Sequence, residues 1–344
     1  MIGILDQIEV SATQLTTVQN LFAERYLPGA KARGMSLARS WIAPPVAVSA
    51  APNTLWVLWE LPDIGAWWGM RARAGADPAL VTFWAEVDRR CVKRDRHYLI
   101  DNDLQSANVL PAPLPLTGVT PIAGDGARES AQMFLKKNVA AADIAALEVA
   151  LRAAPQHIEG LRRVFLARNS EGSFGAGDFT WDADFIDAAA RADAAHSDYQ
   201  KAVLQPLLAK TIEREWRMGA QLIGGGLRAP ALQNCIVRTA YFRLLPNAPE
   251  AVAAQLEAAL LQMPAYMPGM TNWRLSRALD GEWTYIWEQE YARLDDLLGE
   301  YMVHPFHWAY IDPWFDPEFS RQIIATQLSH AFCPAADSVL AWGI

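Results

Sequence analysis

The chain has 344 residues, 52% of them hydrophobic and 20% charged, which is enough apolar material for two or three folded units and excludes a disordered protein. Its 30 basic and 38 acidic residues give a net charge of −8, which argues against nucleic acid and anionic membranes as partners. The sequence shows no signal peptide, no apolar run that could cross a bilayer, and only three widely spaced cysteines. We therefore expect a cytoplasmic protein with reduced thiols.

The first third of the chain opens with a long amphipathic segment that ends in Tyr-Leu-Pro-Gly at residues 26–29. Two strand-like runs follow, around residues 37–40 and 55–60, and the second is aromatic and ends in Trp59-Glu60. Residues 88–96 mix acids and bases, which predicts the solvated, salt-bridged face of a helix.

The middle of the chain is a fainter version of the same order. Its pattern predicts a strand at residues 133–138, a helix at 142–153, strands around Val164 and Phe179, a helix at 187–214 and a strand at 216–223. Residues 107–128 and 224–231 are rich in proline and glycine and are expected to be linkers. The glycine triplet at 224–226 lacks the lysine of a phosphate-binding loop.

The last third gives the clearest pattern. Asn247 is expected to cap a helix that Pro249 opens and Pro268-Gly269 ends, and Asp280-Gly281 predicts a tight hairpin. The other expected elements are strands at 236–245, 273–279 and 283–290, a helix at 294–310 and a strand at 323–332.

These three stretches repeat one order of elements. Tyr-Met-Pro-Gly at residues 266–269 matches residues 26–29, and Trp287-Glu288 matches Trp59-Glu60. The order βαββαβ predicts an α+β chain of three tandem ferredoxin-like units, at residues 1–106, 129–223 and 232–344. Helices cover one face of each such sheet, so the other face needs a second sheet. We expect two units to pair within the chain and the third to pair with its equivalent in a homodimer.

One run in the last unit carries candidate chemistry. Tyr301, His304 and His307 follow one another at intervals of three residues, so that each is a neighbour of the next on a helix. Pro305 removes a backbone donor and is expected to kink that helix. Histidine moves protons near neutral pH, and a tyrosine hydroxyl stabilises a developing oxyanion.

Aromatic side chains surround this run and are expected to bind a flat apolar molecule. The candidate wall residues are Trp283, Tyr285, Trp287, Trp308, Tyr310 and Trp314.

The Tyr-x-x-His-Pro-x-His run, placed after a strand and at the start of the second helix of its unit, resembles the stress-responsive dimeric α/β-barrel (Dabb) family. That family includes a plant olivetolic acid cyclase. The resemblance covers about the last 110 residues well. It implies ferredoxin-like units paired sheet to sheet, with Tyr301 and His307 as an acid/base pair and His304 as an orienting residue. The first two units lack the motif and are expected to be scaffold or pocket wall.

Other interpretations stay open. His304 and His307 could bind a metal with a carboxylate such as Asp312, Glu288 or Glu290, and His307 could hold a haem. Glu288 and Glu290 share a strand face, which is more often a solvated face than a paired acid/base site. Cys235 and Cys333 are expected to be buried small hydrophobes.

The sequence thus leads to one main hypothesis and two alternatives. The main hypothesis is a cofactor-independent and metal-independent enzyme, a lyase, cyclase, isomerase or decarboxylase, acting on an aromatic or polyketide-like small molecule. The alternatives are a non-catalytic ligand-binding or stress-response protein, and a haem- or metal-dependent oxidative enzyme.

Overall fold

The computed structural model describes residues 1–102, 110–124 and 127–342, and the chain divides into two compact units. Unit 1 is Met1–Pro111 with Pro305–Thr326, and unit 2 is Ala112–His304 with Gln327–Ile344. Residues 305–326, which were expected in the third ferredoxin-like unit, therefore pack with the first stretch of the chain. In the described part of the chain, no helix is long and apolar enough to cross a membrane.

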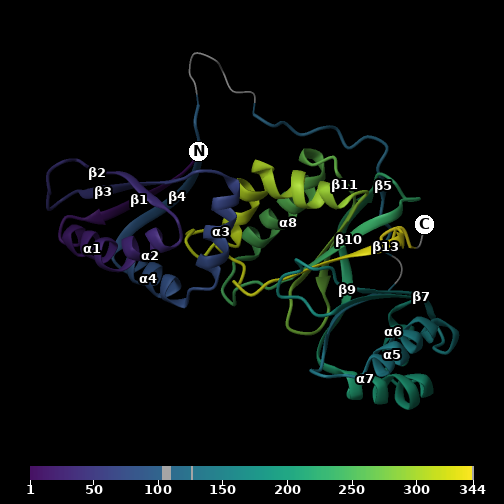
Figure 1. Cartoon of the computed structure of the whole chain (residues 1–344). Coiled ribbons are helices and arrows are strands. Elements are labelled where there is room, and N and C mark those ends of the chain that lie inside the picture. Colours follow the sequence, from purple (N-terminus) through teal and green to yellow (C-terminus); the bar gives the residue numbers. More distant parts are fainter. Residues whose placement is uncertain (103–109, 125–126, 343–344) are drawn as a thin grey trace. The chain divides into compact units, whose positions relative to one another are not determined.

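Unit 1 is a four-stranded antiparallel sheet with helices on one face (Figure 1). The strand order is β2-β3-β1-β4, formed by β1 (Ile2–Ser11), β2 (Ser36–Ala43), β3 (Pro52–Leu61) and β4 (Cys91–Ile100). The helical elements are α1 (Leu15–Leu21), η1 (Phe22–Tyr26), α2 (Leu27–Ala32), α3 (Ile64–Gly75), α4 (Pro78–Asp88), η5 (Phe306–Ile311) and η6 (Asp312–Trp314). Asp63 and Asp77 cap α3 and α4, accepting bonds from the Ala66 and Ala79 amides at 2.8 and 2.9 Å.

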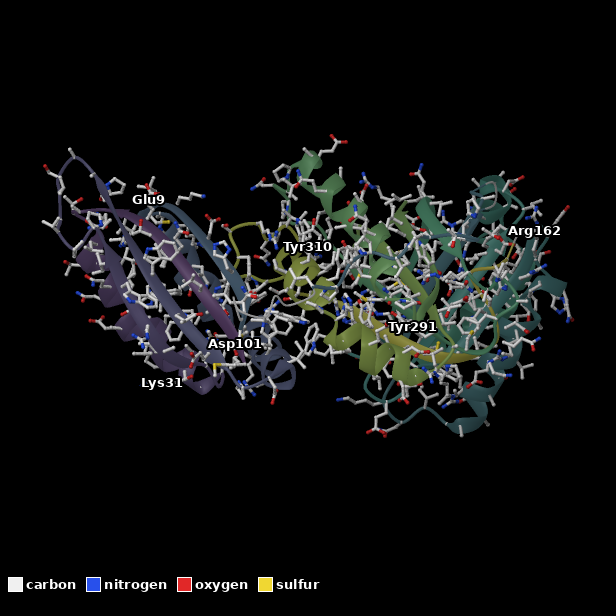
Figure 2. The ribbon with its side chains drawn as sticks, turned by 90° about the horizontal axis from the view of Figure 1, so that it is seen from above. Glu9, Lys31, Asp101, Arg162, Tyr291 and Tyr310 are labelled. Carbon is white, nitrogen blue, oxygen red and sulfur yellow. The ribbon has the colours of Figure 1, made fainter. Side chains whose placement is uncertain are left out.

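Burial along β1 alternates strictly, because one face of the sheet lies under the helices and the other is partly open. Figure 2 shows Glu9, on the open face, and Lys31, on α2, on opposite sides of unit 1. The expected helix at residues 88–96 is wrong. Residues 91–96 lie in β4, where Arg94 and Arg96 are buried and ion-paired.

Unit 2 contains a larger antiparallel sheet whose two ends meet. The eight strands run in the order β13-β10-β12-β11-β9-β6-β8-β7, and a short β5 (Thr120–Pro121) also pairs with β9. The backbone of Phe174, just after β7, pairs with His330 on β13, at 2.7 and 2.8 Å. The sheet is therefore closed like a barrel. Its strands are β6 (Ala127–Leu135), β7 (Leu161–Arg168), β8 (Phe179–Phe185), β9 (Ile212–Leu227), β10 (Gln233–Phe242), β11 (Met270–Ala278), β12 (Tyr285–Tyr291) and β13 (Ser329–Asp337).

Helices cover the outside of this barrel. They are α5 (Ala141–Ala153), η2 (Ala154–Gln156), α6 (Ala188–Ala194), η3 (Gln200–Leu204), α7 (Gln205–Thr211), α8 (Glu250–Tyr266) and η4 (Asp296–Tyr301). Every residue of β8 and of β12 is buried, because one face of each strand meets a helix and the other faces the barrel interior.

The strand order β2-β3-β1-β4 recurs as β7-β8-β6-β9 and β11-β12-β10-β13. The last two groups share one sheet through the pairing of β9 with β11. The glycines at 224–226 belong to β9, so the expected linker there is wrong. Part of the other expected linker, at residues 103–109 and 125–126, lies outside the described residues.

Several expected boundaries also differ. Asn247 does not cap α8, which begins after Pro249 without a side-chain cap. The continuous helix expected at 187–214 is three shorter helical pieces, because β9 begins at Ile212. The last strand begins at Ser329 and not at residue 323, since residues 323–326 pack in unit 1. A hairpin joins β11 and β12 around Asp280-Gly281, with Gly281 at φ +84°, but the connection spans residues 279–284 and is longer than the tight turn expected.

Candidate functional site

The predicted catalytic run is divided between the two units. Tyr301 and His304 belong to unit 2, and His307 belongs to unit 1. The helix expected at 294–310 consists of the π-helical turns η4 and η5, and it is interrupted at His304, next to Pro305. A break was expected at this proline.

Tyr301 is buried on the helix-covered face of β10 and β12. The guanidinium carbon of Arg238 lies 5.3 Å from the Tyr301 ring centroid, and the Tyr291 ring lies 6.2 Å away. Arg238 and the Tyr291 hydroxyl both donate to the side-chain oxygen of Gln289, at 3.1 and 2.9 Å. Burial raises the pKa of Tyr291 well above its usual value, so that hydroxyl stays protonated.

Two buried hydrogen-bond donors of β12 lie on the same helix-covered face as Tyr291. Side chains alternate along a strand, so Trp287 and Gln289 share the face of Tyr291. Among the described residues, neither the Trp287 indole N–H nor the Gln289 side-chain nitrogen has a hydrogen-bond partner. Buried donors without acceptors cost about 1–3 kcal/mol each. A molecule with an oxygen acceptor would recover that cost.

His304 lies near the ring of Tyr266, with the ring centroids 6.1 Å apart. Partial burial lowers the pKa of His304, and the nearby Glu300 carboxylate opposes this shift. His304 is therefore mainly neutral at pH 7, the form that accepts a proton.

The other predicted residues of the run lie in unit 1. The His307 ring is buried 5.1 Å from the Trp68 ring, and Trp308 belongs to the hydrophobic core of this unit, 5.6 Å from Trp67. Tyr310 is half exposed and Trp314 is buried, with their ring centroids 5.5 Å apart.

The predicted aromatic wall is not one surface. Trp283 packs in the barrel interior, 4.9 Å from Trp216. Tyr285 and Trp287 lie on the outer face of β12, where the Tyr285 hydroxyl donates to Glu257 of α8 at 2.6 Å. Trp283 therefore cannot line a site together with these two residues, a correction that follows from the closure of the sheet.

The barrel interior also corrects the expectation for Glu288 and Glu290. Both are buried rather than solvated, because β12 is covered on both faces. Glu290 is fully bonded. It accepts from Asn272 at 2.7 Å, from Ser338 at 2.6 Å and from the backbone amides of 339 and 340 at 2.6 and 2.9 Å. Its role is to hold the C-terminal segment.

Glu288 belongs to a charged cluster that sequence reasoning missed. Arg128 lies 2.9 Å from Glu288 and 3.3 Å from Asp182, and Arg274 lies 3.7 Å from Glu288. Burial raises the pKa of Asp182 to about 7, against the effect of Arg128 and with a contribution from Glu288. The sequence feature that pointed toward this cluster was the alternation of aromatic and polar residues at 179–184. That alternation indicates a strand, but it does not show that the polar face of the strand is buried inside a barrel.

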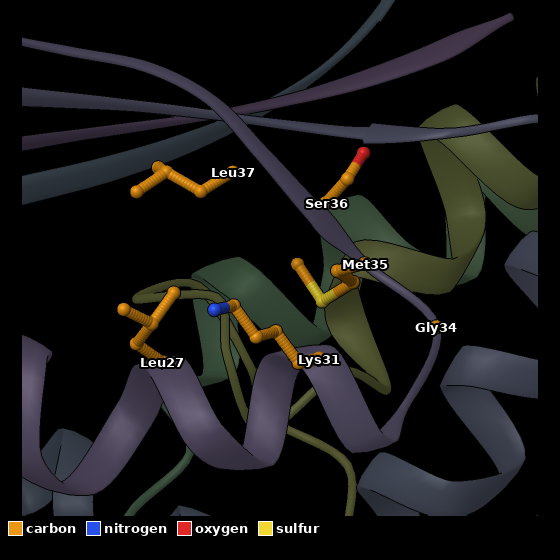
Figure 3. Close-up of a pocket in the computed structure, with 6 residues that line it drawn as sticks. All are labelled: Leu27, Lys31, Gly34, Met35, Ser36 and Leu37. Carbon is orange, nitrogen blue, oxygen red and sulfur yellow. The ribbon is translucent and has the colours of Figure 1, made fainter.

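Surface grooves lie elsewhere. A groove of about 520 Å³ in unit 1 runs between α2 and β2, with Leu27 and Lys31 of α2 facing Leu37 of β2 (Figure 3). A second hollow of about 320 Å³ surrounds the connection between β7 and β8. None of the predicted site residues lines either one. Within the described residues, no group of three or more His, Cys, Asp and Glu side chains could hold a metal ion.

No family model and no curated protein matches the chain. Among solved structures, an anthrone oxidase-like protein is 10% identical and covers 64% of this chain and 95% of its own, with a TM-score of 0.49. A Dabb family protein with a ferredoxin-like fold from Mesorhizobium loti is 15% identical and covers 27% and 93%, with a TM-score of 0.25. A dimeric ferredoxin-like protein of unknown function from Thermobifida fusca is 19% identical and covers 29% and 92%, with a TM-score of 0.26.

Proposed function

We propose that the protein is a cofactor-independent acid/base enzyme that acts on an aromatic or polyketide-like small molecule. The observation that carries the proposal is the buried Tyr301 hydroxyphenyl beside Arg238, facing a strand whose donors at Trp287 and Gln289 have no partner among the described residues. These groups supply donors to an oxygen that gains negative charge.

The reaction begins when a histidine removes a proton from a carbon next to a carbonyl group. The electron pair moves to the carbonyl oxygen, and Tyr301 and Arg238 stabilise the enolate. In a substrate whose enolate is conjugated with a further double bond, return of the proton to the far carbon gives an isomer. Attack of the enolate carbon on a second carbonyl of the same molecule closes a ring, and the alkoxide that forms takes the proton back from the histidine. Neither route needs an oxidant, a reductant or a metal.

Two histidines compete for the role of base. The family resemblance points to His307, which stays a prediction from sequence. His304 lies in the same unit as Tyr301. Because its pKa is lowered, its ring is mainly in the neutral form, which can accept a proton. Variants of each histidine separate the two assignments.

The architecture proposed with this function is a chain of three ferredoxin-like units, each with the strand order described above. The barrel of unit 2 pairs two of them. The open sheet face of unit 1 then binds the same face of a second copy in a homodimer.

The test is a turnover screen of wild type against Tyr301→Phe, His304→Ala and His307→Ala, with aromatic ketones and linear polyketide-like diketones. We expect Tyr301→Phe and one histidine variant to retain binding and to lose about 10²-fold or more in kcat. Tyr199→Phe is the control and should keep full activity, because the Tyr199 hydroxyl of unit 2 only donates to the Ala150 carbonyl oxygen, at 2.9 Å. Binding without turnover in wild type would favour the ligand-binding alternative. Turnover that survives all three variants would remove this site.

A further inference from the structure

The interior of the unit 2 barrel contains buried polar side-chain atoms that have no hydrogen-bond partner among the described residues. Among the described residues, the Oγ1 of Thr239, the Oγ of Ser329 and the Nη1 of Arg128 have no hydrogen-bond partner. Neither oxygen of Asp182 accepts a hydrogen bond of normal length and angle, although its carboxylate lies 3.3 Å from Arg128 and the Ser130 hydroxyl is close enough to lower its pKa. All four residues are at most 4% exposed. Buried polar groups without partners are uncommon, and a polar ligand bound in the interior would satisfy them.

These groups converge because of strand register. Arg128 on β6 reaches across the interior to Glu288 on β12, and Thr239 on β10 is the direct cross-strand neighbour of Glu288. Arg274 on β11 is the neighbour of Glu288 on its other side. Both halves of the barrel therefore contribute to one cluster, which neither half could form alone.

The arginines of this cluster can bind an added anion only if one of the carboxyl groups loses its charge. Arg128 and Arg274 face the three carboxyl groups of Asp182, Asp184 and Glu288, and Arg274 has a lowered pKa because it is buried and close to Arg128. If Asp182 takes up a proton, one negative charge is lost, and the carboxylate of a ligand can replace it. The net charge of the interior then stays unchanged, so such an exchange avoids leaving a charge unpaired in a buried place.

An aromatic group adjoins the charges. The Ser130 hydroxyl, on the strand of Arg128, lies 2.7 Å from the Tyr241 hydroxyl. The ring of Tyr241 lies 6.1 Å from that of Trp283, which in turn packs against Trp216. The interior thus offers cationic donors at one side and aromatic faces at the other.

We infer that the barrel interior is a second binding site, separate from the Tyr301 site, and that it takes a small aromatic monocarboxylate together with one proton. The carboxylate binds to Arg128 and Arg274, its free oxygen accepts a hydrogen bond from protonated Asp182, and its ring packs on Trp283 and Tyr241.

Proton uptake is a consequence of the surroundings of Asp182. The titratable or charged groups that face it are Arg128, Asp184, Glu288, Arg274, Tyr241 and Cys333. Burial raises the pKa of Tyr241 and that of Cys333, so both stay neutral at pH 6–8. The nearest residues of β7 and β9, Phe165 and Met218, do not titrate. Asp182, with a pKa of about 7, is then the group that changes charge in this range.

The experiment is isothermal titration of the full chain with benzoate at pH 6 and pH 8, in buffers of different ionisation heat. We expect binding about tenfold weaker at pH 8, with uptake of close to one proton at that pH, because only the protein with protonated Asp182 binds. Asp182→Asn should bind with no pH dependence. Arg274→Met should lose about tenfold or more in affinity.

Arg277→Met is the matched control, since Arg277 lies three residues along the same strand, is partly exposed and pairs with Glu257. Its affinity should equal that of wild type. Absence of benzoate binding in wild type at both pH values, binding that ignores pH, or an equal loss in Arg274→Met and Arg277→Met would each overturn the inference. Tyr301→Phe should bind benzoate normally, which separates this site from the proposed catalytic one.

Discussion

Glu318 shows how residues 305–326 are held in unit 1. Its carboxylate lies 2.8 Å from Arg96 and 3.7 Å from Arg33, and it accepts hydrogen bonds from the Tyr26 hydroxyl and, at 3.1 Å, from the Trp84 indole. Burial alone would raise the pKa of Glu318, but the two arginines and the hydrogen bonds from Tyr26 and Trp84 together lower it. The carboxylate is therefore charged, and its ion pairs and hydrogen bonds hold residues 305–326 against the rest of unit 1.

Glu318→Gln should destabilise the protein by about 3 kcal/mol, because Arg96 keeps its buried charge and loses a partner. Unfolding in urea measures the change. Glu86→Gln removes the partly exposed partner of Arg25 and should cause little or no loss. Equal stability of Glu318→Gln and wild type would show that the segment does not depend on this carboxylate. Because the pKa of Glu318 is lowered, its contribution should fade as pH falls below about 4.

Asp182 should have the opposite pH dependence. A folded-state pKa of about 7 lies above that of the unfolded chain, so the contribution of this group is present at low pH and is lost as pH rises from about 4 to 7. Between pH 5 and pH 8 wild type should lose about 1–3 kcal/mol of unfolding free energy relative to Asp182→Asn. Parallel urea titrations of both proteins test this, and parallel pH profiles would refute a raised pKa at Asp182.

The two candidate sites differ in how far the sequence predicted them. Tyr301 and His304 were found because a short run of acid/base side chains is visible in one segment. Asp182 and Arg128 were not found, since their partners come from strands far apart in the chain. Glu288 was noticed but assigned to solvent, because a strand covered on both faces looks the same as one with a polar outer face.

The longest strand, β9, joins the two halves of the barrel. Its first part pairs with β6 and its last part with β11. At Gly225 the two backbones approach so closely that a Cβ atom would lie 2.6 Å from the carbonyl oxygen of Trp273. The junction of β9 with β11 therefore requires glycine at this position. The glycine-rich composition that suggested a linker at residues 224–226 is due to this close approach of two strands.

Gly225→Ala should cost about 2 kcal/mol or more, because the obstacle is backbone and cannot rotate away. Gly75→Ala, at the end of α3 with no atom within 4 Å of the added Cβ, should be neutral or slightly stabilising. Thermal unfolding compares the two. A Gly225→Ala protein as stable as wild type would contradict the close contact of β9 with β11.

Elements with strong local signals were predicted well. The hairpin at Asp280-Gly281 and the helices α5 and α8 fall close to their expected places, and Cys235 and Cys333 are buried in strands as expected. Segments that pair with residues far away in the sequence were predicted poorly. Residues 91–96 form a strand because β1 pairs with them, a contact that local charge patterning does not reveal.

One face of the unit 1 sheet is largely apolar, partly exposed and, among the described residues, not covered by helices. The open face of its sheet carries Leu5, Trp56 and Leu58, with Trp41 47% and Leu99 38% exposed. Acidic and basic residues are both present on this face, so it is compatible with a twofold-related copy of itself. This supports the homodimer proposed above.

Leu58→Arg should convert a dimer into a monomer, since it places a charge at the centre of an apolar contact. Sedimentation velocity at micromolar concentration measures the mass. Val81→Arg, on the exposed side of α4, is the control and should leave the dimer intact. A monomeric wild type, or a Leu58→Arg protein that stays dimeric, would exclude pairing through this face.

Proton exchange in D₂O tests directly whether the protein is an acid/base enzyme. Wild type, treated with a chelator and shown to be free of chromophores, is mixed with an enolisable aromatic ketone, and deuterium entry next to the carbonyl is followed by proton NMR. An acid/base enzyme of the kind proposed should accelerate exchange about 10²-fold or more over buffer, and Tyr301→Phe should abolish most of that gain. Exchange no faster than in buffer across a panel of such ketones, or exchange that returns only with added metal or haem, would contradict the account.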